Sequence, residues 1–155
     1  GTMIHASICE SIRPLERADI SEVLSIMEPY VQQGVLVSRD SEAIETRMRD
    51  FVVYDVDGTV HGCAALHDFR DGTGEIAAVA VDRHFSSMGI GRRLVTYLFE
   101  RARDTGLRRI FALTTQTSDW FESMGFREGE LSDIPQKRRS SYNPQRNSKI
   151  LVYDL

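Results

Sequence analysis

Apolar residues recur along the chain with two different periods, and stretches of one period alternate with stretches of the other. Where they recur every three to four residues, the spacing predicts amphipathic helices. Asp19 and Asp40 precede two of these stretches and are of a residue type that caps helix N-termini, while Gly106 and Gly125 end two others. The predicted helices run from 19 to about 30, over 41–48, from Gly91 to Gly106, and within 118–126.

Short apolar or alternating runs between these helices predict strands. The pair Asp57-Gly58 joins two of them in a hairpin, because Asp-Gly is a strong two-residue turn signal. The predicted strands are residues 7–13, 51–55, 61–69, 75–82, 109–115 and 149–155. The polar segment from Leu131 to Ser148 is assigned no element, and the chain has no internal repeat, low-complexity tract or linker. The pattern therefore predicts one mixed α/β domain over residues 1–155.

Composition excludes several classes of protein. A chain of 155 residues with 41% hydrophobic and 27% charged residues is typical of a globular protein with a real core. The net charge of -4 argues against a nucleic-acid partner, and no apolar run approaches the roughly 18 residues that span a membrane. With no secretory signal, and with only Cys9 and Cys63 as cysteines, we expect a reducing cytoplasm. Gly1 and Thr2 precede Met3 and are set aside as a cloning remnant.

Two glycines one residue apart, Gly89 and Gly91, open the third predicted helix. Glycines at a helix N-terminus let an anion approach the unpaired N–H groups closely. Arg92 and Arg93 follow in the first turn, where a cation opposes the helix dipole, and this placement indicates a bound anion. The alternative is a tight turn with two surface arginines. The dinucleotide-binding fingerprint is excluded, because Leu94 stands where its third glycine would be.

The segment "SSMGIG" resembles the coenzyme A signature Q/R-x-x-G-x-G/A of the GNAT superfamily of N-acetyltransferases, with Ser86 where the family usually has Gln or Arg. Within it, the closest resemblance is to the acetyltransferase domain of N-acetylglutamate synthases. The stretches that carry it are "QQGVLVSRDSE", "GEIAAVAV", "LTTQTSDWFESMGF" and "DIPQKRRSSYNPQRNSKIL". The resemblance implies a central mixed, mostly antiparallel sheet of six to seven strands flanked by about four helices. We expect no amino-acid-kinase-like domain.

The resemblance also implies roles for individual residues. Glu75 is expected to be the general base, and Thr114 the hydroxyl that serves the leaving thiolate, because Phe121 stands where many relatives have a tyrosine. Leu36 and Ala78 would contact the substrate, and Arg39 and Arg146 would grip its carboxylates, since a guanidinium binds a carboxylate through two hydrogen bonds. Acetyl-CoA would contact Val79, Ala80, Val81, Ser86, Ser87, Met88, Gly89, Ile90, Gly91 and Arg92.

The remaining basic, histidine and aromatic residues receive simpler interpretations. Lys137, Arg138 and Arg139 are expected to be solvated or to contact the 3′-phosphate of the coenzyme. Trp120 and Phe121 are expected to pack in the core. The four histidines lack the spacing of metal ligands, so no metal is expected. They are His5, His61, His67 and His84.

The resemblance implies acetyl transfer from acetyl-CoA to the α-amine of L-glutamate, the first step of arginine biosynthesis. One alternative is acetylation of another small amine or of a protein N-terminus. An alternative of another class is a non-catalytic domain that senses acyl-CoA. The expected partners are therefore acetyl-CoA and L-glutamate, with no nucleic acid and no membrane, and a homodimer is the assembly considered.

Overall fold

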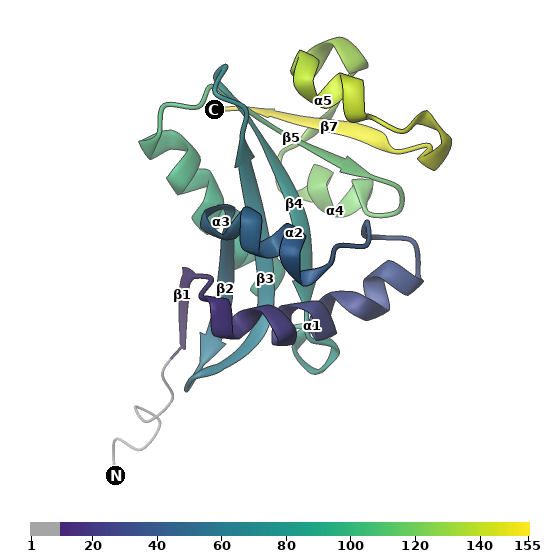
Figure 1. Cartoon of the computed structure of the whole chain (residues 1–155). Coiled ribbons are helices and arrows are strands. Elements are labelled where there is room, and N and C mark those ends of the chain that lie inside the picture. Colours follow the sequence, from purple (N-terminus) through teal and green to yellow (C-terminus); the bar gives the residue numbers. More distant parts are fainter. Residues whose placement is uncertain (1–9) are drawn as a thin grey trace.

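One seven-stranded sheet organises residues 10–155, the part of the chain that the computed structural model describes (Figure 1). Its strand order is β1-β2-β3-β4-β5-β7-β6. All neighbours pair antiparallel except β4 and β5, which are parallel. The strands are β1 (Glu10–Pro14), β2 (Phe51–Val56), β3 (Thr59–Asp68), β4 (Thr73–Val81), β5 (Arg109–Thr114), β6 (Arg127–Glu128) and β7 (Lys149–Asp154).

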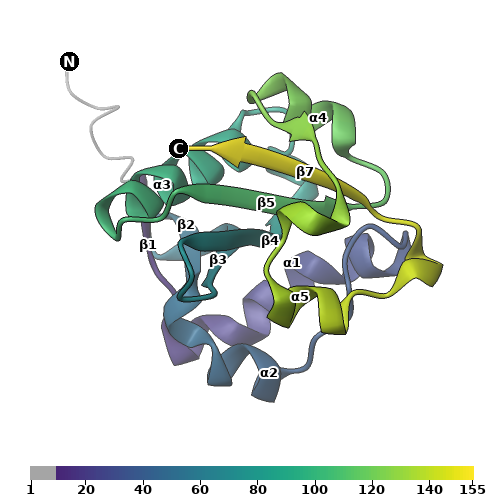
Figure 2. The ribbon, with the colours of Figure 1, turned by 90° about the horizontal axis from the view of Figure 1, so that it is seen from above.

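Helices cover both faces of this sheet. Viewed from above, α1, α2 and α5 lie on one side, and α3 and α4 on the other (Figure 2). The α-helices among the described residues are α1 (Ile20–Gln32), α2 (Ser41–Thr46), α3 (Ile90–Asp104), α4 (Ser118–Ser123) and α5 (Gln136–Ser141). Short 3-10 turns are η2 (Arg17–Asp19), η3 (Met48–Asp50), η4 (Arg83–Phe85), η5 (Leu131–Asp133) and η6 (Pro144–Arg146).

The hydrophobic period predicted most of these elements correctly. The hairpin turn is confirmed, since Asp57 and Gly58 have φ values of +52° and +88°, the positive angles that such a turn requires. The first strand is confirmed from Glu10, while residues 7–9 of that prediction lie outside the described residues.

Two elements were not predicted, and both lack an apolar pattern. Helix α5 has the sequence QKRRSS with no buried residue, so it carries no hydrophobic period. Strand β6 has only two residues, both exposed. The segment 131–148 is therefore more ordered than its polar sequence indicated, and the described helices number five rather than about four.

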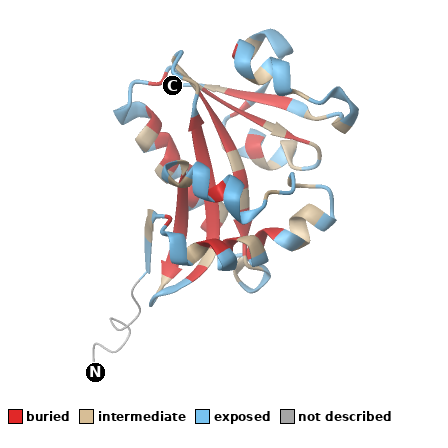
Figure 3. Ribbon diagram, viewed as in Figure 1, coloured by how far each residue is buried: buried red, intermediate tan, exposed pale blue. Residues whose placement is uncertain are grey.

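Buried residues lie mainly on the central strands (Figure 3). Among the described residues they form two large layers, one on each side of the sheet, and a smaller third cluster around Phe111 and Val152. Val52 and Tyr54 of β2 face the layer beneath α3, where Leu94 and Leu98 are fully buried. Phe51 and Val53 alternate with them and face the layer beneath α1. This alternation fixes which side chains of each strand point toward which helices.

Strands β4 and β5 stay together over only three residue pairs. Thr73, Gly74 and Glu75 pair with Arg109, Ile110 and Phe111, and no pair follows in the described ladder. Strand β5 pairs with β7 along its whole length. After the last pair with β4, β5 and β7 turn away from β4 together (Figure 1). The sheet is therefore split along the later half of β4.

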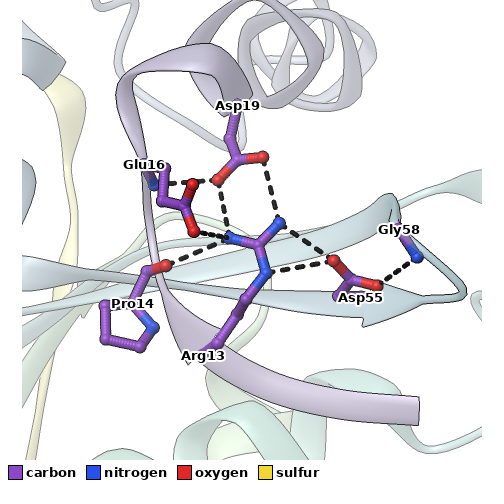
Figure 4. Close-up of polar contacts among 6 residues, drawn as sticks. All are labelled: Arg13, Pro14, Glu16, Asp19, Asp55 and Gly58. Atoms are coloured by element: carbon purple, nitrogen blue, oxygen red, sulfur yellow. Dashed lines mark hydrogen bonds and ion pairs between the residues drawn. The ribbon is translucent and has the colours of Figure 1, made fainter. Parts of the chain in front are cut away.

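Arg13 joins the N-terminal strand to the first helix and the β2–β3 hairpin (Figure 4). Its Nη1 and Nη2 donate to both carboxylate oxygens of Asp19, at 2.8 and 3.1 Å, and its Nε donates to Asp55 at 3.0 Å. Asp55 in turn accepts from the backbone N–H of Gly58 at 2.7 Å. One planar guanidinium thus holds three segments in register.

The prediction that the Asp19 side chain caps α1 is wrong. That carboxylate accepts from Arg13 and from the backbone N–H of Glu16, and it makes no capping hydrogen bond to α1. Asp40 does cap α2 as predicted, with its Oδ1 accepting from the backbone N–H of Ala43 at 2.8 Å. The hydrogen bonds from Arg13 hold the pKa of Asp19 below its usual value.

We expect Asp19→Asn to lower the free energy of unfolding by about 1–3 kcal/mol at pH 7, the range for charge-assisted hydrogen bonds in a partly buried site. Because the pKa of Asp19 is lower in the folded protein, its contribution is complete above the unfolded value of about 3.9 and is lost as the pH falls through the folded value. Urea unfolding of the variant and the original protein should therefore converge in acid.

Glu45→Gln is the matched control, because the pair of Glu45 with Arg17 is exposed and should contribute less than about 0.5 kcal/mol. An equal loss of stability in the two variants, or an Asp19→Asn loss that does not shrink in acid, would contradict this account.

Candidate active site

The split in the sheet opens a cavity of about 350 Å³ between β4 and β5. The β4 residues from Ile76 to Val81 form one wall, and Leu113 and Thr114 of β5 contribute to the other. Tyr30 of α1 reaches the same place and donates from its hydroxyl to the carbonyl of Val81 at 2.7 Å. The cavity is thus a slot that presents the backbone of β4, which has no strand partner on that side beyond Glu75 in the described ladder.

A bulge in β4 changes which side chains face this cavity. Cys63 pairs with Ala80 and Ala65 with Ala77, so one residue of β3 faces both Ala78 and Val79. Ala78 has φ of +56°, a conformation that non-glycine residues seldom adopt. The thiol of Cys63 donates to the carbonyl of Ala78 at 3.3 Å. Burial raises the pKa of Cys63 to about 12, so the sulfur keeps the proton that this bond requires.

The N-terminus of α3 closes one end of the cavity. Gly89 and Gly91 both line it, together with Ser86 and Arg92. Gly89 is the N-cap with φ of +72°, and a Cβ added there would meet no atom within 4 Å. The first N–H groups of a helix have no partner within the helix, so this end presents hydrogen-bond donors to the cavity.

The other predicted coenzyme contacts are distributed differently. Val79, Ala80 and Val81 line the cavity. Met88 is 58% exposed and Ile90 is buried in the core, and neither these two nor Ser87 is among the lining residues. Ile90 can therefore offer only its backbone to a ligand.

The two arginines after the glycines have separate environments. Arg92 lines the cavity, as an anion site requires. Arg93 instead forms an ion pair with Glu10 at 3.1 Å and stacks over the ring of Tyr54 at 5.1 Å. The interpretation of Arg93 as a sign of a bound anion is wrong, because Glu10 explains its position.

Thr114 forms a hydroxyl pair with Thr117, a residue that the sequence analysis missed. The two Oγ1 atoms are 2.6 Å apart, and the Thr114 Oγ1 also accepts from the backbone N–H groups of Thr117 at 2.9 Å and Gln116 at 3.3 Å. Either hydroxyl of the pair can be the donor. Both residues line the cavity, so the hydroxyl hydrogen that is not used within the pair is available to a ligand there. A threonine three residues after another at a strand end was the available signal.

The expectation that Trp120 and Phe121 are core residues is partly correct. Phe121 is 6% exposed and packs in the core, and Trp120 packs against it. Both also line the cavity. Their rings therefore form part of the apolar wall opposite β4.

A second, larger cavity of about 830 Å³ lies beneath α2 and α5. Glu75 lines it and is only 7% exposed, and Arg39 lines it from the segment between α1 and α2. Burial lowers the pKa of Arg39, although attraction by Glu75 opposes this effect. Arg39 donates to the carbonyl of Val37 at 3.3 Å, and no carboxylate within residues 10–155 forms an ion pair with it. It is thus a partly desolvated cation beside the predicted base.

Arg138 is not solvated, contrary to one expectation, and it lies by Glu75 rather than by the glycines. Its Nε donates to Oε1 of Glu75 at 2.8 Å, with 23% of the arginine and 9% of the glutamate side chain exposed. Residues 136–141 carry no hydrophobic period that predicts a helix, so the direction of this side chain could not be anticipated. Lys137 and Arg139 are both exposed, and Lys137 lines the same cavity while Arg139 does not.

A buried histidine lies opposite Glu75 on the neighbouring strand β3. His67 is 8% exposed and pairs in register with Glu75, so the two side chains leave the same face of the sheet. The Nδ1 atom of His67 lies 2.7 Å from a carboxylate oxygen of Asp50. The sequence analysis considered His67 only as a metal ligand and missed this pair.

Arg146 lies apart from the other predicted substrate contacts. It sits on η6, and its Nη2 donates to the carbonyl of Gly34 at 3.3 Å. It lines neither cavity, whereas Leu36 and Ala78 line the smaller one and Arg39 the larger. The structure thus groups three of the four predicted substrate residues around β4.

Within residues 10–155, no group of three or more His, Cys, Asp or Glu side chains could hold a metal ion. No helix in this part of the chain is long and apolar enough to cross a membrane.

Comparisons with known proteins agree with this geometry. The model of the acetyltransferase (GNAT) family matches residues 15–126. The amino-acid acetyltransferase of Pasteurella multocida is 37% identical over 156 residues, which is 100% of this chain and 36% of that protein. The chain therefore spans about a third of the length of such curated relatives.

Two solved structures resemble the whole described fold. N-acetylglutamate synthase from Neisseria gonorrhoeae, complexed with coenzyme A and N-acetyl-glutamate, has a TM-score of 0.90 at 37% identity over 95% of this chain and 35% of that one. Rv2747 from Mycobacterium tuberculosis, in complex with CoA and NLQ, has a TM-score of 0.81 at 25% identity over 94% of this chain and 99% of that one. The predicted fold is confirmed.

Proposed function

We propose, from the premise that this chain belongs to the acetyltransferase (GNAT) family, that it transfers the acetyl group of acetyl-CoA to the α-amine of L-glutamate. The products are N-acetylglutamate and coenzyme A. The observation that carries the proposal is that successive residues of β4 line two cavities, one presenting backbone and helix N–H donors and the other presenting Glu75 among cations. The likeness to the amino-acid acetyltransferases and to the N-acetylglutamate synthase complex supports this choice of acceptor.

Acetyl-CoA would occupy the smaller cavity. Its pyrophosphate would bind the N-terminus of α3 at Gly89–Gly91, where the helix dipole and free N–H groups favour an anion. Its pantetheine amides would pair with the backbone of Val79 and Val81 as an added strand, since β5 has left that edge of β4 open. The thioester would then lie near the bulge at Ala78.

The chemistry needs a neutral amine, a stabilised oxyanion and a leaving thiolate. Glu75 would accept the amine proton, directly or through water, and the amine nitrogen would attack the thioester carbon. Backbone N–H groups near Ala78 and Val79 would stabilise the oxyanion. When the carbon–sulfur bond breaks, its electron pair goes to sulfur, and the hydroxyl pair of Thr114 and Thr117 would donate to the thiolate.

The carboxylates of glutamate would bind the cations of the larger cavity. Arg39 supports this assignment, because it is partly desolvated and has no carboxylate partner in the part of the chain that the structure describes. Leu36 and Ala78 would contact the acceptor near the thioester. Arg146 remains a predicted carboxylate contact, and it would have to leave the carbonyl of Gly34 to reach the larger cavity. A cytoplasmic location and a homodimer also remain predictions.

A thiol-release assay tests the function. Purified protein with acetyl-CoA should release coenzyme A with L-glutamate faster than with L-aspartate or L-glutamine, and mass spectrometry should identify N-acetylglutamate. Preference for another small amine or a peptide N-terminus would assign another acceptor to the same chemistry. Binding of acetyl-CoA without turnover of any amine would favour an acyl-CoA sensor.

Gly89→Val should raise the Kd for acetyl-CoA about tenfold or more in calorimetry, because a side chain would stand where the phosphate approaches the backbone. Gly106→Val is the matched control at the other end of α3. Gly106 has φ of +81° and, like Gly89, no atom within 4 Å of an added Cβ. Both variants should lose similar stability from backbone strain. Equal affinities in the two variants would place the phosphate elsewhere.

Glu75→Gln should lower kcat by about 10²- to 10⁴-fold near neutral pH, because the amide keeps the shape but cannot accept the amine proton. The loss should shrink at high pH, where the amine of glutamate is already neutral. Steady-state rates from pH 6 to 10 check both statements. A near-normal rate at pH 7 would remove Glu75 from the chemistry.

A further inference from the structure

Glu75, the group that the reaction needs as a base, is already hydrogen-bonded to Arg138. Oε1 of Glu75 already accepts from the Arg138 guanidinium at 2.8 Å, and the glutamate side chain is 9% exposed. A proton moving onto this carboxylate would leave the half-buried guanidinium of Arg138 without its ionic partner, which is costly. The pair therefore has to open, or Arg138 has to find another anion, before Glu75 can act.

Arg138 has the donors to bind a second anion. Its Nε bonds Glu75 and its Nη1 bonds Ser141 at 3.0 Å, while Nη2 has no hydrogen-bond partner among residues 10–155. A guanidinium offers five N–H donors in one plane, so at least the two on Nη2 remain for a ligand. The side chain lines the larger cavity, where an acceptor would enter.

Arg138 lies on a short helix that is not anchored in the core, so its side chain can change position. Helix α5 has six residues, none of them buried, so moving it disturbs little core packing. Arg39 is attracted by Glu75 and repelled by Arg138, which means that Glu75 lies in the field of two cations. A substrate carboxylate that enters the cavity would reduce the repulsion between Arg39 and Arg138 and would compete with Glu75 for one of these cations.

We propose that Arg138 exchanges partners when the acceptor binds: the side-chain carboxylate of the acceptor takes the guanidinium, and Glu75 is released to accept the amine proton. This inference rests on the proposed function. The α-carboxylate would bind Arg39, which every amino acid can use. The second carboxylate would bind Arg138, which only an acidic amino acid can use. Selectivity then arises in kcat, since a neutral acceptor leaves Glu75 tied to Arg138.

The test compares L-glutamate with L-glutamine in the original protein and in Arg138→Gln. In the original protein, L-glutamine should bind but turn over slowly. In Arg138→Gln, Glu75 is free without a trigger, so kcat for L-glutamine should rise about tenfold or more, while KM for L-glutamate should rise about ten- to a hundredfold. A substitution that only damages the fold cannot raise a rate.

Arg139→Gln is the matched control, because Arg139 is the exposed neighbour on α5 and loses the same charge. It should leave both substrates within about twofold of the original values. Adding Glu75→Gln to Arg138→Gln should abolish the gain with L-glutamine, which shows that the gain passes through Glu75. Circular dichroism and thermal unfolding verify that each variant is folded.

Each outcome decides. If the original protein acetylates L-glutamate and Arg138→Gln slows both substrates by the same factor, the exchange is overturned and the proposed function stands. If kcat for L-glutamine rises as described, the exchange is supported. If the original protein does not acetylate L-glutamate at all, the proposed function fails and the inference falls with it.

Discussion

The separation of β4 from β5 after three residue pairs is the constraint on which the rest of this site depends. A continuous sheet would satisfy the backbone of β4 on both edges and leave no polar groups for a ligand. Here β5 takes β7 as its antiparallel partner, and β4 keeps a free edge beside the N-terminus of α3. The same opening therefore exposes both the backbone edge of β4 and the N-terminus of α3, the two features that the proposal assigns to acyl coenzyme A.

The bulge at Ala78 adds a second consequence to that opening. Before it, Glu75 points toward the layer of α1 and α2, and Ile76 toward α3. After it, the alternation is shifted by one residue, so that Ala78 and Ala80 face the α1 layer. One strand thus presents a carboxylate to the larger cavity and an open backbone to the smaller one.

The two half-buried guanidiniums of Arg13 and Arg138 illustrate different uses of the same group. Arg13 uses Nε, Nη1 and Nη2 on two carboxylates, and this saturated arrangement suits a structural joint. Arg138 bonds one carboxylate and one hydroxyl and has donors to spare at the mouth of a cavity. The first arrangement fixes segments in place, while the second is suited to exchanging ligands.

Much of this could be predicted from the sequence, where a periodic pattern or a glycine requirement was present. Such signals were present in every strand except β6, in the main helices, in the hairpin at Asp57 and Gly58 and in the glycines of α3. The partners of charged side chains did not. Asp19 bonds Arg13 rather than its own helix, Arg93 bonds Glu10, and Arg138 bonds a residue 63 positions away. Such pairings depend on tertiary placement, which hydrophobic periodicity does not encode.

Amide hydrogen exchange of the whole protein, with and without acetyl-CoA, tests the central claim most directly. The free edge of β4 and the first turn of α3 have unpaired N–H groups that the coenzyme should cover. The account predicts that acetyl-CoA slows exchange at Ala77–Val81 and at Gly89–Arg92, while β2, which is paired on both edges, changes little. Protection that appears elsewhere, with β4 unchanged, would show that the split in the sheet is not where the coenzyme binds.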